Sequence, residues 1–288
     1  MSFGLRTACA AALAAVLLQA CGGPGPREDG PPRDAAAREL PPDAVPRTEP
    51  KSRYGNPASY VVFGRRYHVM DTAHGHVERG IASWYGVKFH GRRTSSGEIY
   101  DMHLMTAAHR SLPLPSYVEV VNLENNRRVV VRVNDRGPFH ANRIIDLSYS
   151  AARKLDIVRT GTGLVEIRAL TPGHAPERVE PAPTLRPVSV APAAPAAPAA
   201  PMLRPASAAP APRLYLQAGA FSESGNAQRL RERIASLGGA AVRVHEAVVA
   251  GQRLFRVRLG PLSDVAQADR LSAQMVATGI DLPQIVIE

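Results

Sequence analysis

The stretch Arg128-Val-Val-Val-Arg-Val-Asn-Asp-Arg-Gly-Pro138 decides the fold expected for the first half of the chain. Val129, Val131 and Val133 recur at every second position, which is the period of a strand that buries one apolar face. The strand ends in Asp-Arg-Gly-Pro, and Gly and Pro beside a polar side chain are typical of a turn. We therefore predict a half-buried strand that carries Asp135 to a loop at its end.

Similar short segments surround this strand. Residues 118–120 alternate in the same way, and Asn125-Asn126 has the turn chemistry of a hairpin between the two strands. The other expected elements are short: strands over 81–85 and 164–167, and a helix over 148–155 with Ser148 as its N-cap. Many short strands around one helix predict an all-β barrel over residues 77–171.

A second folded region is expected over residues 213–288. Apolar residues alternate in its first segment and then recur at helical spacing, and a similar order follows toward its end. The resulting order β-α-β-β-α-β is that of a split βαβ sandwich, a small α/β fold in which two helices cover one face of four strands. The other face of the sheet stays open, and we expect a ligand to bind there.

Low-complexity segments separate these regions. Residues 172–212 form a Pro/Ala-rich linker, and such a sequence is semi-extended and forms no core. Residues 21–76 are rich in Pro, Gly and Ala and are expected to be a flexible N-terminal spacer. Within this spacer, the segment 58–76 carries apolar residues and fits either the spacer or the first domain.

Residues 1–20 have the features of a lipoprotein signal peptide. Arg6 precedes a short apolar run that ends in Leu-Gln-Ala-Cys at residues 18–21. Cleavage before Cys21 removes Cys9, so that a single cysteine remains and no disulfide can form within the chain. We predict that Cys21 is lipidated and anchors the protein at the periplasmic face of the outer membrane, because Gly22 rather than Asp follows it. The alternative is an ordinary signal peptide with an incidental cysteine.

The formal net charge of the chain is +10, and nearly all of its positive residues are arginine. In a cytoplasmic protein, such a charge would raise the question of nucleic acid. For an exported protein we expect an anionic polymer of the cell envelope as the partner, and no nucleic acid.

Polar residues of the first region gather in five strings: Gly80–Gly86, Phe89–Asp101, Leu104–His109, Val133–Pro138 and Ile144–Ser148. Cleavage of a glycosidic bond needs a carboxylic acid that protonates the leaving oxygen. These strings supply carboxylates, and the first of them supplies Trp84 and Tyr85, whose rings suit stacking on sugars.

The strings resemble those of the rare lipoprotein A family of septal lytic transglycosylases. The matching strings are Ala-Ser-Trp-Tyr-Gly, Ser-Gly-Glu-x-Tyr-Asp, Leu-Pro-Leu-Pro-Ser-Tyr-Val, Val-Asn-Asp-Arg-Gly-Pro-Phe and Arg-Ile-Ile-Asp-Leu-Ser. The resemblance implies a double-psi β-barrel that cleaves peptidoglycan between N-acetylmuramic acid and N-acetylglucosamine. It also implies 1,6-anhydro ends and a preference for strands stripped of peptide stems. Residues 213–288 look like a SPOR domain, the module that binds such denuded strands at division septa.

When the family's functional residues are carried over to the matching positions, the resemblance implies that Asp135 is the catalytic acid. Glu98 and Asp101 are expected to line the same cleft. His109 is expected to hydrogen-bond a catalytic carboxylate or the sugar. Each residue also has a simpler interpretation: Asp135 braces its turn, Glu98 and Asp101 are solvated loop charges, and His109 is a core residue.

The candidate glycan-binding residues are Trp84 and Tyr85 in the first region and Gln217, Leu254 and Arg256 in the second. The last three alternate away from the core set and are expected to face out from the open sheet. The alternatives are core packing for the two aromatic residues and an ordinary surface role for the other three.

No metal or cofactor is expected. His68, His74 and His76 gather in one segment, but the sequence offers them no cysteines or carboxylates at ligand spacing. Phosphate-binding glycine loops and a serine nucleophile turn are also missing.

The leading interpretation is therefore a lytic transglycosylase that acts in daughter-cell separation. The alternative class is a non-catalytic, expansin-like peptidoglycan-binding lipoprotein, and a further enzymatic alternative is a hydrolase that uses water.

Overall fold

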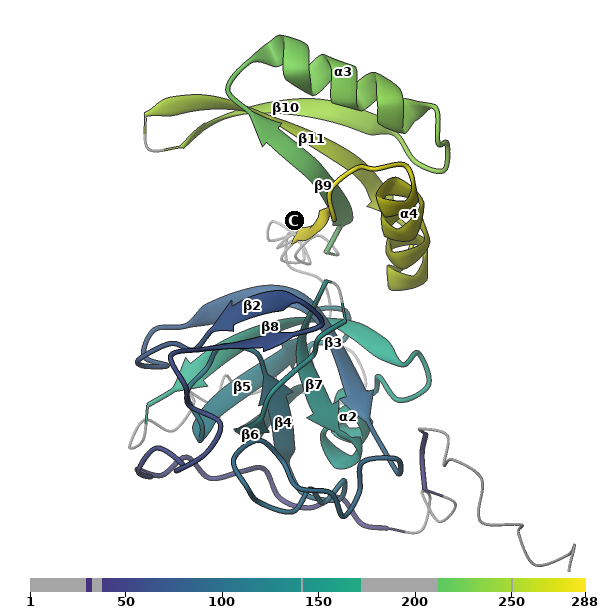
Figure 1. Cartoon of the computed structure of the whole chain (residues 1–288). Coiled ribbons are helices and arrows are strands. Elements are labelled where there is room, and N and C mark those ends of the chain that lie inside the picture. Colours follow the sequence, from purple (N-terminus) through teal and green to yellow (C-terminus); the bar gives the residue numbers. More distant parts are fainter. Residues whose placement is uncertain (1–29, 33–37, 141, 172–211, 250) are drawn as a thin grey trace, which may run out of the picture.

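The computed structural model describes residues 30–32, 38–140, 142–171, 212–249 and 251–288 (Figure 1). The expected signal segment 1–20, the expected lipidation residue Cys21 and residues 172–211 of the expected linker lie outside the described residues. No helix in the described part of the chain combines the length and the apolar character needed to cross a membrane.

Six strands form a closed barrel in the first region. They are β3 (Val77–Tyr85), β4 (Thr106–His109), β5 (Ser116–Asn122), β6 (Arg128–Asp135), β7 (Arg143–Ser148) and β8 (Thr162–Leu170). Around the barrel their order is β3-β7-β4-β6-β5-β8, so most neighbours in space are not neighbours in sequence. β3 pairs with β7 and β4 with β6 in parallel, and the other barrel pairings are antiparallel. The predicted all-β barrel is confirmed.

The stretch that decides the fold forms β6, as its alternation predicts. Val129, Val131 and Val133 are fully buried in the barrel core, because alternate side chains of a barrel strand point inward. β6 pairs with β5 through a hairpin turn in which Asn126 has a φ of 60°, a conformation that asparagine tolerates. Helix α2 (Tyr149–Leu155) begins at the predicted N-cap Ser148, whose side chain accepts a hydrogen bond from the backbone N–H of Ala151.

Residues 38–76 pack against the barrel, which corrects the expectation of a flexible spacer for this part of 21–76. Its segment 58–76 contains a two-stranded antiparallel sheet, β1 (Ser59–Val62) and β2 (Arg65–His68). Residues 38–76 are attached to the barrel by backbone hydrogen bonds that include Ala44 N to Val130 O (3.0 Å), Ser52 N to Leu114 O (2.8 Å) and Met70 N to Ser111 O (2.7 Å). We call residues 38–57 the N-terminal strap.

The strap has no periodic apolar face, because it is attached by backbone and side-chain polar groups at separate points. Asn56 illustrates this: its side-chain amide donates to Leu114 O and its side-chain carbonyl accepts from Leu114 N, both at 2.8 Å. Prolines in the strap restrict the unfolded chain and so reduce the entropy lost on docking. Composition alone therefore made an ordered segment look like a linker.

The second region has the predicted β-α-β-β-α-β order. Its elements are β9 (Leu214–Phe221), α3 (Ser224–Ala235), β10 (Val242–Val249), β11 (Gln252–Leu262), α4 (Val265–Ala277) and β12 (Gln284–Ile287). The sheet order is β10-β11-β9-β12, and all pairings are antiparallel (Figure 1). Ile234 of α3 and Met275 of α4 are fully buried in one core with Leu216 and Val257 of the sheet. Both helices therefore cover the same face of the sheet.

Candidate active site

Asp135 stands at the end of β6, where the strand meets the loop around Ser95. Its Oδ1 accepts hydrogen bonds from the backbone N–H of Ser95 (2.7 Å), the hydroxyl of Ser95 (2.6 Å) and the backbone N–H of Arg136 (2.7 Å). All of these donors reach the same oxygen. The carboxyl group is thus held through Oδ1, and Oδ2 receives no hydrogen bond from the described residues.

The guanidinium group of Arg136 binds two segments beside Asp135, the strap and the turn that follows β4. Nε donates to Gly55 O (2.9 Å) in the strap, and Nη1 donates to His109 O (3.0 Å) at the end of β4 and to Leu112 O (2.5 Å). Burial lowers the pKa of Arg136. A planar guanidinium with donors in a rigid fork is suited to such a junction, so Arg136 fixes the backbone that carries Asp135.

Glu98 is bound on the other side of the same loop. Arg132 Nη1 lies 2.9 Å from each of its carboxylate oxygens, and Asn134 Nδ2 donates to Oε2 at 2.8 Å. Arg132 also pairs with Glu49 of the strap, Nη2 to Oε2 at 2.8 Å. The hydrogen bond from Arg132 lowers the pKa of Glu49 to about 2. Both oxygens of Glu98 are therefore occupied, which favours a positioning role over that of a proton donor.

Glu98 and Asp101 line one open groove of about 790 Å³. Asp135 is not part of its lining, so the expected cleft shared by all three carboxylates is not seen, although the neighbouring Asn134 lines the groove. The strap forms one wall of this groove through residues from Pro41 to Glu49. Asp101 Oδ1 accepts from the backbone N–H of His103 at 2.9 Å, so the carboxylate braces its own turn as well as facing the groove.

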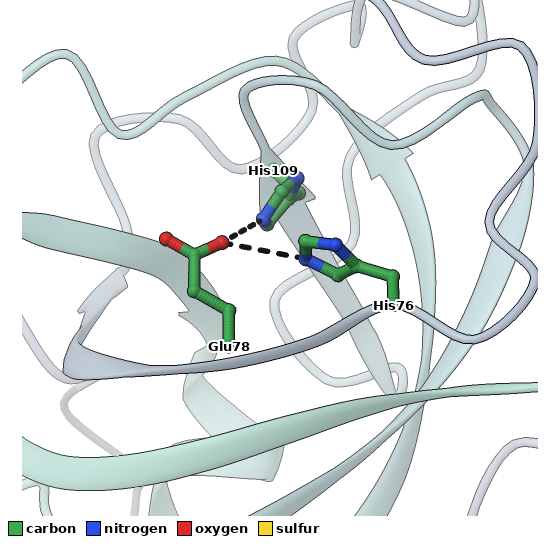
Figure 2. A group of neighbouring side chains, drawn as sticks. All are labelled: His76, Glu78 and His109. Atoms are coloured by element: carbon green, nitrogen blue, oxygen red, sulfur yellow. Dashed lines mark ion pairs between the residues drawn. The ribbon is translucent and has the colours of Figure 1, made fainter. Parts of the chain in front are cut away.

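The side chain of His109 does not contact Asp135, although a hydrogen bond to a catalytic carboxylate was one of its two expected roles. The ring is 1% exposed. Its Nδ1 accepts hydrogen bonds from the backbone N–H groups of Ser111 (3.2 Å) and Leu112 (3.0 Å). Its Nε2 lies 3.4 Å from Oε2 of Glu78 (Figure 2). The simpler interpretation of His109 as a core residue therefore holds for its ring. The backbone carbonyl of His109 accepts a hydrogen bond from Arg136.

His76, Glu78 and His109 place three potential metal-ligating atoms within 4.8 Å of one another (Figure 2). This carboxylate between histidines was not recognised in the sequence. The donor set nevertheless fits a metal poorly. Because Nδ1 of His109 accepts two N–H groups, the proton of the neutral ring sits on Nε2, and the lone pair that a metal needs is absent there. The three side chains form a cluster held at ion-pair distances, with His76 Nε2 at 3.3 Å and His109 Nε2 at 3.4 Å from Glu78 Oε2.

The two aromatic candidates are packing residues in large part. Tyr85 is 8% exposed and stacks on Tyr100 with ring centroids 4.1 Å apart. Burial raises the pKa of Tyr85 well above its usual range. Trp84 is partly buried and packs on Tyr149 at 5.6 Å. Both residues follow the core-packing alternative, with part of Trp84 still open to solvent.

Two exposed aromatic residues near the site were missed. Tyr54 of the strap is 58% exposed, and its ring lies against Gly97 in the loop that carries Ser95 and Glu98. Phe89 is 39% exposed, within cation–π distance of Arg92. The signal that could have identified them is an aromatic residue in a polar segment without apolar periodicity.

In the second domain, Gln217, Leu254 and Arg256 are partly exposed. Leu254 and Arg256 alternate along β11 with buried Val257 and its neighbours, and Gln217 lies opposite Arg258 of β11. This register places them on the sheet face away from the helices. Ile285 of β12, by contrast, pairs with buried Leu216 and packs on the core.

The barrel and the α/β domain define a two-domain enzyme of the lytic transglycosylase class. Residues 77–167 match the family model described as lytic transglycolase, and residues 210–282 match the SPOR domain model. The chain is 37% identical to the endolytic peptidoglycan transglycosylase RlpA of Pseudomonas aeruginosa strain UCBPP-PA14, over 98% of this chain and 96% of that protein. The chain belongs to the RlpA family. The predicted family, double-psi barrel and SPOR domain are thereby confirmed.

Other relatives match over shorter ranges. RlpA of Vibrio cholerae serotype O1 is 50% identical over 55% of this chain and 62% of that protein. The crystal structure of the RlpA SPOR domain from Pseudomonas aeruginosa is 32% identical, covers 25% of this chain and 96% of that chain, and has a TM-score of 0.25.

Proposed function

We propose that the protein is an endolytic lytic transglycosylase that cleaves the bond between N-acetylmuramic acid and N-acetylglucosamine in denuded glycan strands. It leaves 1,6-anhydro ends and acts at the division septum in daughter-cell separation. The observation that supports this most strongly is the Asp135 carboxyl group, held through one oxygen at the end of a barrel strand. Membership of the RlpA family supports the substrate class.

Asp135 serves as the single acid and base of this reaction. Its Oδ2–H protonates the glycosidic oxygen, and the bond from that oxygen to the anomeric carbon of the muramoyl sugar breaks. The carboxylate then takes the proton from the sugar's 6-hydroxyl, whose oxygen bonds to the anomeric carbon and closes the anhydro ring. Because the substrate supplies the nucleophile, this route needs no second carboxylate to activate water.

The groove lined by Glu98 and Asp101 is proposed to hold the glycan, and Asn134, the neighbour of Asp135 in the chain, lines it too. Asp101 offers a carboxylate acceptor for sugar hydroxyls, Glu98 lines the groove while Arg132 and Asn134 hold it, and the exposed ring of Tyr54 offers an apolar face at the edge of the loop. Trp84 contributes through the part of its ring that stays accessible. Hydrogen bonds and ring stacking together are the usual means of recognising a sugar chain.

The SPOR domain is proposed to bring the barrel to its substrate. Gln217 and Arg256 offer hydrogen bonds to sugar hydroxyl and acetamido groups, and Leu254 covers an apolar sugar face. Binding on the same polymer raises the local concentration of substrate at the barrel without changing its chemistry. A lipid on Cys21 would hold both domains at the periplasmic face of the outer membrane.

The test is the chemistry of the product. Purified protein is incubated with peptide-free glycan strands, and the released fragments are analysed by mass spectrometry. We expect 1,6-anhydro ends from the wild type, and a loss of about 10²- to 10⁴-fold in rate for Asp135→Asn. Reducing ends would identify a hydrolase, and binding without release would support the expansin-like alternative.

A further inference from the structure

We propose that Glu78 is a positioning residue for the catalytic site: it orients the His109 ring, which fixes the turn that holds Arg136 and, through it, Asp135. This proposal rests on the proposed function, since part of its test measures that activity. Glu78 lies in β3 and His109 at the end of β4, so tertiary structure alone brings them together (Figure 2).

The first step concerns the proton on His109. Two backbone N–H groups point at Nδ1, so the neutral ring carries its proton on Nε2. Nε2 is buried and makes no hydrogen bond of good geometry within the described residues. Glu78 Oε2 lies 3.4 Å from it, at ion-pair distance. A buried N–H without an acceptor is destabilising, because it loses the hydrogen bond to water that it makes in the unfolded chain. Glu78 is therefore the carboxylate placed to attract this N–H and so to keep the ring in its orientation.

The second step connects the ring to the catalytic strand. By accepting from Ser111 N and Leu112 N, the ring closes the turn that follows β4. The same turn presents His109 O and Leu112 O to Arg136 Nη1. A ring that rotated would release the two N–H groups and displace those carbonyls, and Arg136 adjoins Asp135.

The third step concerns charge. Three titratable or charged groups face His109 within the described structure. They are Glu78 in β3, His76 just before β3, and Arg110, the residue that follows His109 at the end of β4. Burial lowers the pKa of His109, and the carboxylate of Glu78 opposes this lowering. A neutral residue at position 78 should thus make His109 titrate at a lower pH than in the wild type. Local unfolding would instead raise the pKa of His109, because an exposed ring returns toward its ordinary, higher pKa.

The kinetic experiment uses the full chain on peptide-free glycan. Glu78→Ala should lower kcat by about ten- to a hundred-fold with KM changed less than about two-fold, because a small displacement of a catalytic group is costly. Glu78→Gln should restore most of the activity, because its carbonyl oxygen still accepts. The control is Glu166→Ala, which removes a second barrel carboxylate that is paired with Arg79 and Arg168 and does not contact His109.

A second pair of variants tests the turn. In His109→Asn, the side-chain oxygen takes the place of Nδ1 as acceptor for Ser111 N and Leu112 N. We expect His109→Asn to keep at least about ten times the activity of His109→Ala. Equal activity of the two, or equal losses in Glu78→Ala and Glu166→Ala, would overturn the positioning role.

Nitrogen NMR of histidine-labelled protein completes the test without substrate, with the His109 signals assigned by their loss in His109→Asn. The wild type should show Nδ1 unprotonated, and Glu78→Gln should lower the pH at which His109 titrates. An unchanged titration would overturn the proposal, as would calorimetric Zn²⁺ binding that is lost in Glu78→Ala. An inactive wild type with the expected NMR shift would instead contradict the proposed function alone.

Discussion

Ser95 and Asp135, 40 residues apart in the sequence, are joined by two hydrogen bonds to the same carboxylate oxygen, at 2.7 Å from the backbone and 2.6 Å from the hydroxyl. Hydrogen bonds to a carboxylate are stronger than those between neutral groups. This contact ties the long loop after β3 to the end of β6. The position of the proposed acid therefore depends on a serine that carries no chemistry of its own.

Removal of this hydroxyl is the first test of the site. Ser95→Ala should lower kcat by about ten-fold, because one of the bonds that orient the Asp135 carboxyl is lost, a change of about 1.4 kcal/mol. Steady-state release of glycan fragments measures the effect. The control is Ser96→Ala one residue along, since Ser96 contacts Thr94 and not Asp135. Similar losses in both variants would mean that the loop is merely sensitive to any substitution.

The docking of the strap can be tested by its pH dependence. The pKa of Glu49 lies at about 2 in the folded protein, below its ordinary value of 4.5. A lowered folded pKa stabilises the protein above the unfolded value, and this contribution is lost as pH falls from about 4.5 to about 2. Glu49→Gln should therefore reduce the free energy of unfolding at pH 7 by about 1 kcal/mol, after allowance for solvent screening.

Urea unfolding of Glu49→Gln and wild type at pH 7 and near pH 2 measures this difference, which should vanish at the lower pH. Glu39→Gln is a control within the strap. Equal free energies of unfolding for Glu49→Gln and wild type at pH 7 would mean that Glu49 of the strap does not pair with Arg132 in solution.

The open face of the SPOR sheet makes a separate prediction about binding. Gln217→Ala and Arg256→Ala should each weaken binding to denuded strands by about five- to ten-fold, without a change in melting temperature. Sedimentation with denuded peptidoglycan measures this in an Asp135→Asn background, which prevents cleavage. Arg253→Ala removes the same charge from β11, where Arg253 pairs with Glu246, and should bind normally. Equal weakening in Arg256→Ala and Arg253→Ala would point to net charge as the cause.

The division of labour between the domains predicts the effect of truncation. A chain that ends at Pro172 should keep most of its activity on soluble naked glycan and lose enrichment at the septum, because the SPOR domain contributes local concentration. Fragment release and fluorescence microscopy measure the two effects. Ile81 and Leu164 of the barrel share an apolar cluster with C-terminal residues. Loss of activity in a folded truncated barrel would mean that this contact completes the enzyme.

Anchoring is tested at the expected lipidation residue. Cys21→Ser should leave the protein without lipid and move it from the outer-membrane fraction to the soluble periplasm, because the acyl chains provide the attachment. Fractionation and immunoblotting measure the distribution. Cys9→Ser is the matched control, since Cys9 lies in the segment expected to be removed. Unchanged membrane association of Cys21→Ser would exclude the lipid anchor.

The local patterns of the sequence were enough for many of the elements and for the order of the second domain, whereas β1, β2, β4 and β7 were not predicted. The alternation of Val129, Val131 and Val133 predicted β6, Ser148 predicted the start of α2, and the repeated spacing after Arg213 predicted the second domain. Each is a local property, because side-chain period and capping depend on residues within a few positions. The short polar strings, through their resemblance to a family, also indicated Asp135, Glu98 and Asp101.

Only the tertiary structure decided which of these groups meet. The barrel order places β4 between β7 and β6, and that order brings His109 to Glu78 and its backbone to Arg136. The strap was misjudged because docking through dispersed polar contacts leaves no periodic signal, and with it Tyr54 and Glu49 were missed. The sequence determines which secondary structure each segment forms, because side-chain period and capping act between residues a few positions apart. The partners of a buried charge depend on non-local packing, which has no counterpart in spacing along the chain.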